Sequence, residues 1–447
     1  MKKVKVGYFS LVKGSWINDR LAGQRTDALN MLNSLDIELV DCGDLIQNEA
    51  QAAEAIEKFA DAGVDCLVVH FLTFALGACA PSAAKKLGVP VIFWSVPEPP
   101  MQGGRLQANS FCATNMNAHA LWRMGLNYSF VYGDHNTVKE KLMEKFLVVR
   151  AIRELGRLRI GSVGGRVPGF YTSNYDELAL CAKFGVETEK ITLLEVVDRA
   201  KKILEGSVDP VCEAADKVRI KDITSEEQRK LKALYQALEE TAAKYRLSTF
   251  ALRCWPDVND IYGLGICALI GMLNETKYIT ACEGDVLGAV AMKLGEWLTD
   301  GAIPFFCDWI YFDEKENTGV VWHCGAAAPS LCRGGCTPQF CKSSIIDGGG
   351  VKGVTCEFPL KPGRITMMRL GETREQGKYR LFVASGTALD TDQILRGNPL
   401  KVKFDRQVSE MVDTVIGNGI EHHYVVVHGD ITDKLKQFAE WMDIEVL

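Results

Sequence analysis

Two acids and two histidines, far apart in the sequence, have the chemistry of ligands for a hard divalent metal ion. Glu283 follows an apolar run in "ACEGDVLGAVAMKLG", and Asp308 follows another in "IPFFCDWIYFDE". His323 and His423 lie in later apolar segments. Mn²⁺ favours carboxylate and imidazole ligands and keeps positions open for water or substrate oxygens. One such acid alone is more often a cap or a loop charge, but together the residues predict a divalent metal site, with Mn²⁺ as the expected ion.

The elements that position these residues begin with apolar runs that alternate with amphipathic stretches of helix length. The runs are "KVKVGYFS", "DIELVDCG", "DCLVVHF", "PVIFWSV" and "YSFVYGD". Such alternation predicts a doubly wound parallel sheet. A long helix ending near Leu155 closes this first α/β domain, residues 1–155.

A second doubly wound α/β domain is expected over residues 156–317. Its apolar runs are "RLRIGSV", "ITLLEVV", "TFALRCW", "KYITACEGD" and "AIPFFCDWIYF". Open parallel sheets bind ligands at the carboxyl ends of their strands, and we expect Glu283 and Asp308 to lie there. The segment "RIGSVGGR" lacks the full GxGxxG pattern, so a dinucleotide site is not expected.

From Thr318 the pattern changes to short strands separated by Gly-rich turns, as in "TGVVWHC", "GVTCEFPL" and "GRITMMRLGE". This predicts a mainly antiparallel β domain over residues 318–447, which carries His323 and His423.

Composition favours a large soluble enzyme. The chain has 447 residues, 47% of them hydrophobic and 24% charged, which is enough for substantial cores. A net charge of −6 and the lack of a basic cluster argue against nucleic acid as a partner. The N-terminal apolar stretch is broken by lysines, and the longest apolar run is too short for a bilayer span of about 20 residues. We therefore expect a cytoplasmic protein without a membrane partner.

A group of cysteines stands out in the Gly-rich segment "HCGAAAPSLCRGGCTPQFCKSS". Cys324, Cys332, Cys336 and Cys341 lie close together in sequence, and Cys356 follows. An iron-sulfur or zinc site is conceivable, but the spacing lacks the paired CxxC knuckles of such sites. We expect reduced thiols here, since the fifteen cysteines carry no sign of a disulfide framework.

The sequence resembles the L-arabinose isomerase and L-fucose isomerase superfamily along nearly its whole length. The tail "GIEHHYVVVHGD" is similar to the segment whose second histidine binds the metal, which implies that role for His423. "CEGDVLGAVAMKL" is similar to the family segment whose first glutamate is both ligand and acid/base, here Glu283. "PFFCDWIYFD" implies a second acidic ligand at Asp308, and "VVWHCGAAAPSL" a further metal histidine at His323.

The resemblance also implies sugar contacts in the N-terminal domain. "KGSWINDR" corresponds to a sugar-contacting loop and suggests Trp16 and Arg20, while "VVHFLTF" suggests His70 and Thr73. "FCATNMNAHALWRMG" resembles a segment that presents a histidine to the site of a neighbouring subunit, which points to His119.

His422 is a further candidate for substrate contact. If "EHHYVVV" is a strand, successive side chains alternate, so His422 is expected to project away from the face of His423 and not to bind the same ion. An anionic substrate tail has candidate partners in Arg20, Arg105 and Arg333, each equally plausible as a solvated surface residue.

These expectations combine into a metal-dependent aldose-ketose isomerase that acts on a free monosaccharide through an enediolate. Glu283 and Asp308 are the expected catalytic pair, with Glu283 as the carbon base. The sugar is a pentose, a 6-deoxyhexose or a C6-modified hexose, and the resemblance implies a trimer-based homo-oligomer, commonly a hexamer. The alternatives are a non-catalytic sugar-binding or regulatory protein and a lyase built on the cysteine cluster.

Overall fold

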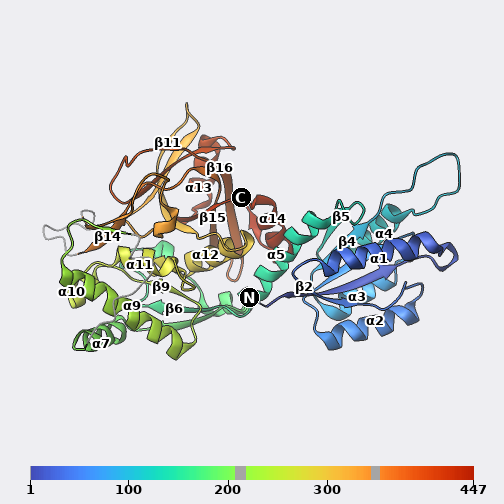
Figure 1. Ribbon diagram of the computed structural model, residues 1–447, viewed down its shortest axis with the longest axis horizontal. Helices are drawn as coiled ribbons and strands as arrows, with labels where there is room; N and C mark the ends of the chain where they lie inside the picture. The colour runs from blue at the N-terminus through green and yellow to red at the C-terminus, as the bar shows by residue number, and fades with distance from the viewer. Residues whose placement is uncertain (1, 207–217, 344–352) are drawn as a thin grey trace. The chain divides into compact units, whose positions relative to one another are not determined.

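The computed structural model describes residues 2–206, 218–343 and 353–447 (Figure 1). The chain forms two compact units. The first comprises Met1–Arg153 and Lys436–Asp443, and the second comprises Glu154–Leu435 and Ile444–Leu447. Within the described ranges no helix combines the length and the hydropathy needed to cross a bilayer.

The first unit is built on a parallel five-stranded sheet in the order β2-β1-β3-β4-β5. Successive residues of a strand point to opposite faces, so Phe9 of β1 packs with α2, α3 and α4, while Tyr8 packs with α1 and α5. All five strands predicted for this region are present. Their bounds are β1 Val4–Leu11, β2 Ile37–Asp41, β3 Cys66–Phe71, β4 Val91–Ser95 and β5 Tyr128–Tyr132. The helices are η1 Gly14–Trp16, α1 Asp19–Asn33, α2 Glu49–Ala62, α3 Cys79–Leu87, α4 Ser110–Arg123 and α5 Lys139–Leu155.

The second unit begins with a smaller parallel sheet in the order β10-β9-β6-β7. Its strands are β6 Arg159–Val163, β7 Glu187–Ile191, β9 Thr249–Leu252 and β10 Thr280–Cys282. Its helices are η2 Tyr171–Ser173, α6 Glu177–Phe184, α7 Leu193–Leu204, α9 Ser225–Tyr245, α10 Asp257–Tyr262, α11 Cys267–Asn274 and α12 Val286–Leu298.

The run "ITLLEVV" is a helix rather than the expected strand. β7 ends at Ile191, and the Thr192 side chain accepts the backbone N–H of Glu195 as the N-cap of α7. The buried positions of α7 are Leu193, Val196, Val197, Ala200 and Ile203. This spacing follows the helical repeat, which the apolar content of the run had masked.

A mainly antiparallel sheet follows, in the order β15-β18-β11-β12-β17-β16-β19, and β15 also pairs with β16 so that the sheet closes on itself. Its strands are β11 Phe305–Asp313, β12 Thr318–His323, β15 Gly363–Glu372, β16 Tyr379–Ala388, β17 Asn398–Phe404, β18 His423–His428 and β19 Glu445–Val446. Short elements complete this part: β8 Arg219–Ile220, η3 Pro329–Leu331, β13 Gln339–Lys342, β14 Val354–Glu357 and α13 Val408–Asn418. Helix α14 Thr432–Trp441 begins in the second unit, and its residues from Lys436 onward belong to the first. The predicted fold class, two parallel α/β regions followed by a mainly antiparallel β region, is confirmed.

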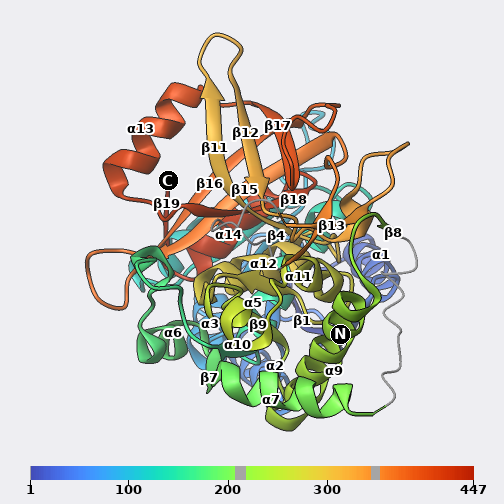
Figure 2. The same cartoon turned by 90° about the vertical axis from the view of Figure 1, so that its left-hand side faces the viewer.

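One strand belongs to a different sheet from the one predicted. β11, the "PFFCDWIYF" run, pairs antiparallel with β12 and with β18, and Figure 2 shows β11 and β12 side by side. The turn between them explains the pairing, because the Asp313 carboxylate accepts the backbone N–H groups of Lys315 and Glu316, and Asn317 has a φ of 53°. Asp308 therefore lies within an antiparallel strand and not at the carboxyl end of a parallel one.

Helix α12 joins the two sheets of the second unit, since it packs against β9 and β10 and also against β15 and β18. The close approach depends on Gly295. A Cβ at this position would lie 2.6 Å from Met368 and 2.7 Å from Val427. The residues that precede α12 are thereby held against the antiparallel sheet.

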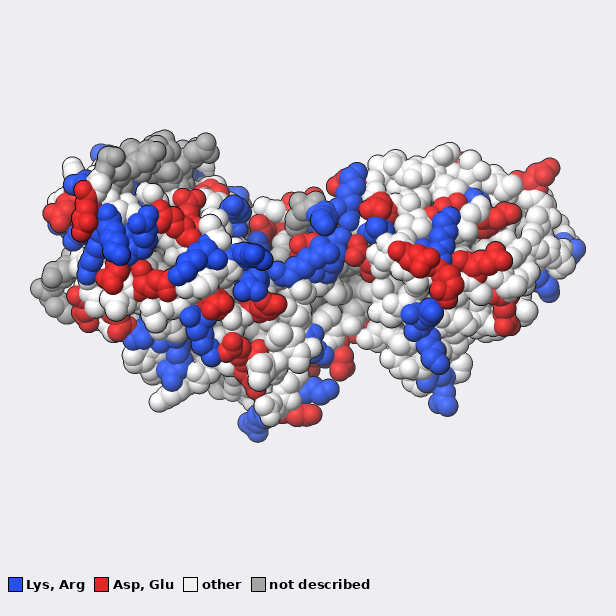
Figure 3. Space-filling view, turned by 90° about the horizontal axis from the view of Figure 1, so that it is seen from below, with Lys and Arg blue, Asp and Glu red and all other residues white. Residues whose placement is uncertain are grey.

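Acidic and basic side chains are interspersed on the face shown in Figure 3. Arg199 with Glu240 and Lys244 with Glu195 are examples of exposed ion pairs in the second unit. Pairs of this exposure contribute little to stability.

Candidate active site

Glu283 stands in the short connection between β10 and α12. Its φ of 61° is a left-handed conformation that costs a non-glycine residue on the order of 1–2 kcal/mol. Gly284 follows with a φ of 70°, and a Cβ there would lie 2.2 Å from the carbonyl oxygen of Gly165. Asp285 then caps α12 by accepting the N–H of Gly288 at 2.7 Å. Backbone strain of this kind is concentrated at functional sites.

His423, the first residue of β18, lies between two carboxylates. Its Nε2 is 2.7 Å from Oε2 of Glu283, and its Nδ1 is 2.9 Å from Oδ2 of Asp285. The residue is 1% exposed. Burial opposes a charge on the ring, but the hydrogen bonds to Asp285 and Glu283 outweigh burial and raise the pKa of His423. The two carboxylates fix the orientation of the imidazole.

Asp285 is itself paired with Arg369 of β15. The Arg369 guanidinium donates to Oδ2 at 2.6 Å and to Oδ1 at 3.3 Å, and both residues are 1% exposed. Burial acts against the carboxylate, yet Arg369 and His423 hold the pKa of Asp285 well below its usual range. A carboxylate that orients a histidine from behind is a common arrangement around metal sites.

Asp308 of β11 lies opposite His423. It is the register partner of His423 across β11 and β18, and its Oδ1 lies 3.9 Å from Nε2 of His423. This oxygen is buried and has no hydrogen-bond partner among the described residues. Burial raises the pKa of Asp308, although His323 and His423 oppose the shift. A buried carboxylate oxygen without a partner fits a site that a cation completes.

His422 lies on the same side as His423, contrary to the expected alternation. β18 begins at His423, so His422 precedes the strand and the two-residue repeat does not apply to it. The two imidazole rings are 3.8 Å apart, and Nδ1 of His422 is 2.7 Å from the Thr172 hydroxyl. Ligand atoms of Glu283, His422 and His423 all lie within 4.8 Å of one another.

His323 ends β12 and lies next to this group without joining it. Its ring centroid is 6.5 Å from that of His423. Phe306 contacts both rings, with centroids 4.5 Å from His423 and 5.7 Å from His323. The structure thus brings together Glu283, Asp308, His422 and His423, and the ring of His323 lies beside them.

Two aromatic side chains that the sequence did not point to line the group. The indole N–H of Trp255 donates to Oε1 of Glu283 at 3.0 Å. Phe170 makes edge contacts with Trp255 and with His422, at centroid distances of 5.7 and 5.3 Å. One carboxylate oxygen of Glu283 is therefore held by Trp255, and the other faces His423.

The N-terminal candidates all belong to the first unit. Trp16 is half-buried at the end of η1, and Arg20 in α1 donates to the carbonyl of Gln107 at 3.2 Å. Thr73, fully buried after β3, accepts the N–H of Lys13 at 2.8 Å. His119 is exposed on α4.

His70 of β3 is 1% exposed, stacked on Trp94 at 3.8 Å, and its Nδ1 is 2.7 Å from the Tyr8 hydroxyl. Burial lowers the pKa of His70 to about 3, so the ring is neutral at physiological pH. Its Nε2 has no hydrogen-bond partner among the described residues.

The arginines considered for an anionic tail have other contacts. The Arg105 guanidinium lies over the Trp16 ring at 5.6 Å. Arg333 is paired with Asp390 at 2.6 Å and with Asp392 at 2.5 Å, which neutralises its charge.

Of the cysteines in the Gly-rich segment, Cys324 pairs with a thiol from outside that segment. The Cys324 sulfur lies 3.1 Å from that of Cys267, and Cys254 and Cys282 form a second pair at 3.1 Å. Within residues 2–206, 218–343 and 353–447, the only group of metal-ligand side chains with suitable spacing is Glu283, His422 and His423.

Comparison with known proteins gives two family matches. Residues 12–156 match the family "Fucose/sulfoquinovose isomerase, N-terminal domain", and residues 339–447 match "L-fucose isomerase, C-terminal domain".

Three proteins of similar sequence are described as sulfoquinovose isomerases. A sulfoquinovose isomerase from Alkalicoccus urumqiensis is 33% identical over 387 residues, which cover 86% of each chain. One from Priestia aryabhattai is 30% identical over 88% of each chain, and one from Clostridium sp. (strain MSTE9) is 29% identical over 85% of each.

Proposed function

The chain belongs to the fucose isomerase-like family and is a sugar isomerase that interconverts an aldose and a ketose, and from this premise we propose both its substrate and its mechanism. The substrate is a free hexose with an anionic group at C6, with sulfoquinovose, which carries a sulfonate there, as the first candidate. The reaction depends on a divalent cation, with Mn²⁺ as the expected ion. The names of the relatives support the substrate, and the side chains around His423 support the cation.

Glu283, Asp308 and His423 are the proposed ligands. The observation that carries this proposal is the buried Oδ1 of Asp308, which has no hydrogen-bond partner among the described residues. It lies 3.9 Å from Nε2 of His423, whose other ring nitrogen is held by Asp285. Carboxylate and imidazole donors suit Mn²⁺. A divalent cation held by these residues would supply Lewis-acid polarisation of the sugar carbonyl, which would make the neighbouring C–H more acidic. His323, whose ring lies 6.5 Å from that of His423, is proposed as a fourth ligand, and His422 adds a further imidazole beside His423.

Glu283 acts as the carbon base. It takes the proton from C2 of the open-chain aldose, leaving an enediolate, and returns a proton to C1 on the same face to give the ketose. Asp308 carries the second proton from the hydroxyl on C2 to the oxygen on C1. The hydrogen bond from Trp255 keeps the Glu283 carboxylate in one orientation during both transfers.

The isotope test separates proton transfer from a hydride shift. In deuterated buffer the ketose is expected to gain solvent deuterium at C1, because a proton held by Glu283 exchanges with water. NMR of the product measures the incorporation. A product without deuterium at C1 after complete conversion would contradict the enediolate route.

The substrate proposal is tested with a panel of aldoses. Sulfoquinovose, the neutral 6-deoxy analogue quinovose, L-fucose and L-arabinose are incubated with EDTA-treated and with Mn²⁺-loaded protein, and ketose formation is followed by NMR. We expect conversion only with Mn²⁺ and the highest kcat/KM for sulfoquinovose. A higher kcat/KM for L-fucose or L-arabinose would reject the anionic substrate while leaving the metal site untouched.

We also propose a cytoplasmic, trimer-based assembly, commonly a hexamer, in which His119 serves the site of a neighbouring subunit. The support is the resemblance of "FCATNMNAHALWRMG" to the family segment with that role. His119→Ala and Glu283→Gln subunits are each expected to be inactive alone and to regain activity when dissociated and reassembled together. Mixed oligomers without activity would contradict a shared site.

A further inference from the structure

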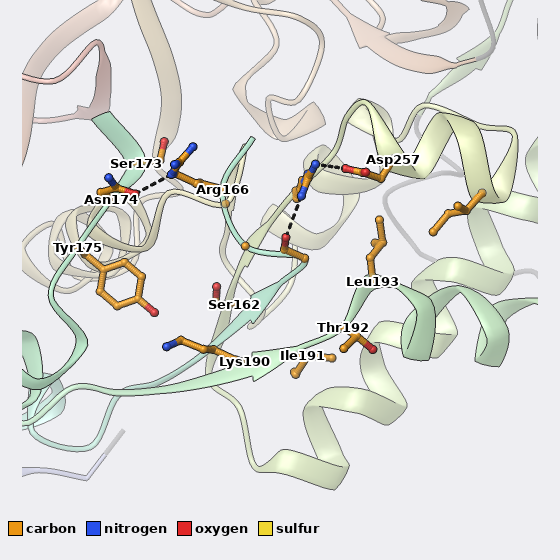
Figure 4. A pocket seen from close by; sticks show the side chains of 15 residues that line it. Ser162, Arg166, Ser173, Asn174, Tyr175, Lys190, Ile191, Thr192, Leu193 and Asp257 are labelled. Carbon is orange, nitrogen blue, oxygen red and sulfur yellow. Dashed lines mark hydrogen bonds and ion pairs between the residues drawn. The ribbon is translucent and has the colours of Figure 1, made fainter. Parts of the chain in front are cut away.

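A cavity separate from the proposed metal ligands lies at the carboxyl ends of the parallel strands of the second unit (Figure 4). Its volume is about 570 Å³, enough for a small organic molecule. The loops after β6, β7 and β9 form it, which is where open α/β sheets bind ligands. None of the proposed metal ligands lines this cavity. Gly284 is the one lining residue that belongs to the connection between β10 and α12, which also carries Glu283 and Asp285.

The charged side chains around the cavity are mostly basic. Arg166, Lys190 and Arg253 line it, against a single acid, Asp257. Asp257 is paired with Arg253, and Lys190 is paired with Glu177, which lies outside the lining. Arg166 bonds to the amide oxygen of Asn174 at 2.6 Å and has no acidic partner among the described residues.

Several hydrogen-bond donors of the lining lack partners. The Ser162 side chain is 5% exposed and makes no hydrogen bond with the described residues. The Tyr175 hydroxyl and Nε of Arg253 are buried and are likewise unpartnered in the described part of the chain. Figure 4 shows Ser162 and Tyr175 on the same side of the cavity as Lys190. Buried donors of this kind are costly unless a ligand or water completes them.

The backbone adds to the positive potential. Thr192 caps the N-terminus of α7, and both Thr192 and Leu193 line the cavity. The N-terminal end of a twelve-residue helix carries a partial positive charge that favours anions. Gly164 allows Arg253 to pack closely, since a Cβ at Gly164 would lie 3.2 Å from Cβ of Arg253.

We propose that this cavity binds a small organic molecule that carries a phosphate or sulfonate group. Guanidinium, ammonium and hydroxyl donors around one space match the oxygens of such a group. The apolar side chains of Ile191, Leu193 and Ile261 offer a surface for the carbon part of the ligand. The inference does not rest on the proposed substrate, because the donors and the cavity are independent of the metal ligands.

The test measures binding without turnover. EDTA-treated protein is titrated calorimetrically with glucose 6-phosphate and, separately, with glucose. We expect saturable binding of the phosphate ester and at least about tenfold weaker binding of glucose, since one lost charged contact has about that effect. Arg166→Gln and Lys190→Gln are each expected to weaken glucose 6-phosphate binding about tenfold.

Lys244→Gln is the matched control for Lys190→Gln. Both lysines are paired with a glutamate, but Lys244 does not line the cavity. The control variant is expected to bind the phosphate ester as the unchanged protein does. No binding of glucose 6-phosphate, or equal affinity in the unchanged protein and in both cavity variants, would overturn the proposal.

Two sources of the ligand are distinguished by kinetics. If the cavity takes the charged tail of the substrate, Lys190→Gln raises KM for sulfoquinovose and leaves KM for quinovose unchanged. If it takes a separate molecule, both KM values stay unchanged while glucose 6-phosphate binding falls. The two proposals can fail separately. If the protein does not isomerise sulfoquinovose but binds glucose 6-phosphate in a way that depends on Lys190, the proposed substrate is wrong and the proposed binding site stands.

Discussion

The side chains around His423 and the cavity lined by Arg166, Lys190 and Arg253 differ in how their charges are arranged. Around His423 the charges are buried and paired: Asp285, Arg369 and His423 are each 1% exposed, and Arg369 and His423 are both hydrogen-bonded to Asp285. Around the cavity Arg166 has no acidic partner among the described residues, and Lys190 is exposed and makes only a surface pair with Glu177. The first arrangement fixes geometry, as catalysis requires, and the second leaves donors free for a ligand that comes and goes.

The largest expected effect concerns turnover. Glu283→Gln removes the proposed carbon base while keeping the hydrogen bond from Trp255, so the fold should be retained and kcat should fall about a thousandfold. Steady-state kinetics with Mn²⁺ and circular dichroism check the two statements. Glu296→Gln, on the following helix and outside the group, is the control. A Glu283→Gln enzyme with more than a tenth of the original kcat would remove Glu283 from its role.

The next effect concerns stability. Arg369→Met leaves the buried Asp285 carboxylate without its guanidinium, and the free energy of unfolding should fall by about 3–5 kcal/mol. Arg364→Met, on the same strand but in an exposed pair with Asp430, should cost only about 0–1 kcal/mol. Urea denaturation compares them. Equal losses in the two variants would contradict a stabilising role for burial of the Asp285–Arg369 pair.

A smaller effect is expected on Mn²⁺ affinity when the carboxylate that orients His423 is replaced. Asp285→Asn keeps a side chain that can cap α12 but loses the negative charge behind His423. Mn²⁺ affinity should fall about 10–100-fold, measured by titration followed by electron paramagnetic resonance. Unchanged Mn²⁺ affinity would show that Asp285 only caps α12 and pairs with Arg369, and does not orient a metal ligand.

The smallest effect is expected in the cavity lined by Arg166, Lys190 and Arg253. Lys190→Gln should leave the free energy of unfolding unchanged within experimental error, because Lys190 is exposed and its pair with Glu177 lies at the surface. Thermal denaturation without added anion checks this. A loss comparable to that of Arg369→Met would mean that the two regions do not differ as described.

The sequence predicted the five parallel strands of the first unit and that Glu283, Asp308 and His423 lie close together, because apolar runs and family motifs are local signals. The roles of these three residues stay predictions. The sequence did not predict that β11 pairs with β18, since pairing partners are non-local. The same pairing places Asp308 opposite His423. His422 was misplaced because the two-residue repeat was extended one residue beyond the true start of β18.

Two supporting residues had signals that went unused. Asp285 follows Glu283 by two residues in "CEGD", and Arg369 interrupts the apolar strand "ITMMRLGE". A lone charge in an apolar strand needs a buried partner, and an acid before a helix predicts an N-cap. Neither signal names the partner, so the pairing of Asp285 with Arg369 required the structure. Trp255 and Phe170 had no comparable signal.

Anomalous diffraction at the manganese edge, on crystals of the Mn²⁺-loaded protein, tests the central claim most directly. The account predicts one strong peak within coordination distance of Glu283, Asp308 and His423. A peak that lies away from these three side chains, or full isomerase activity in protein shown to be free of metal, would contradict it.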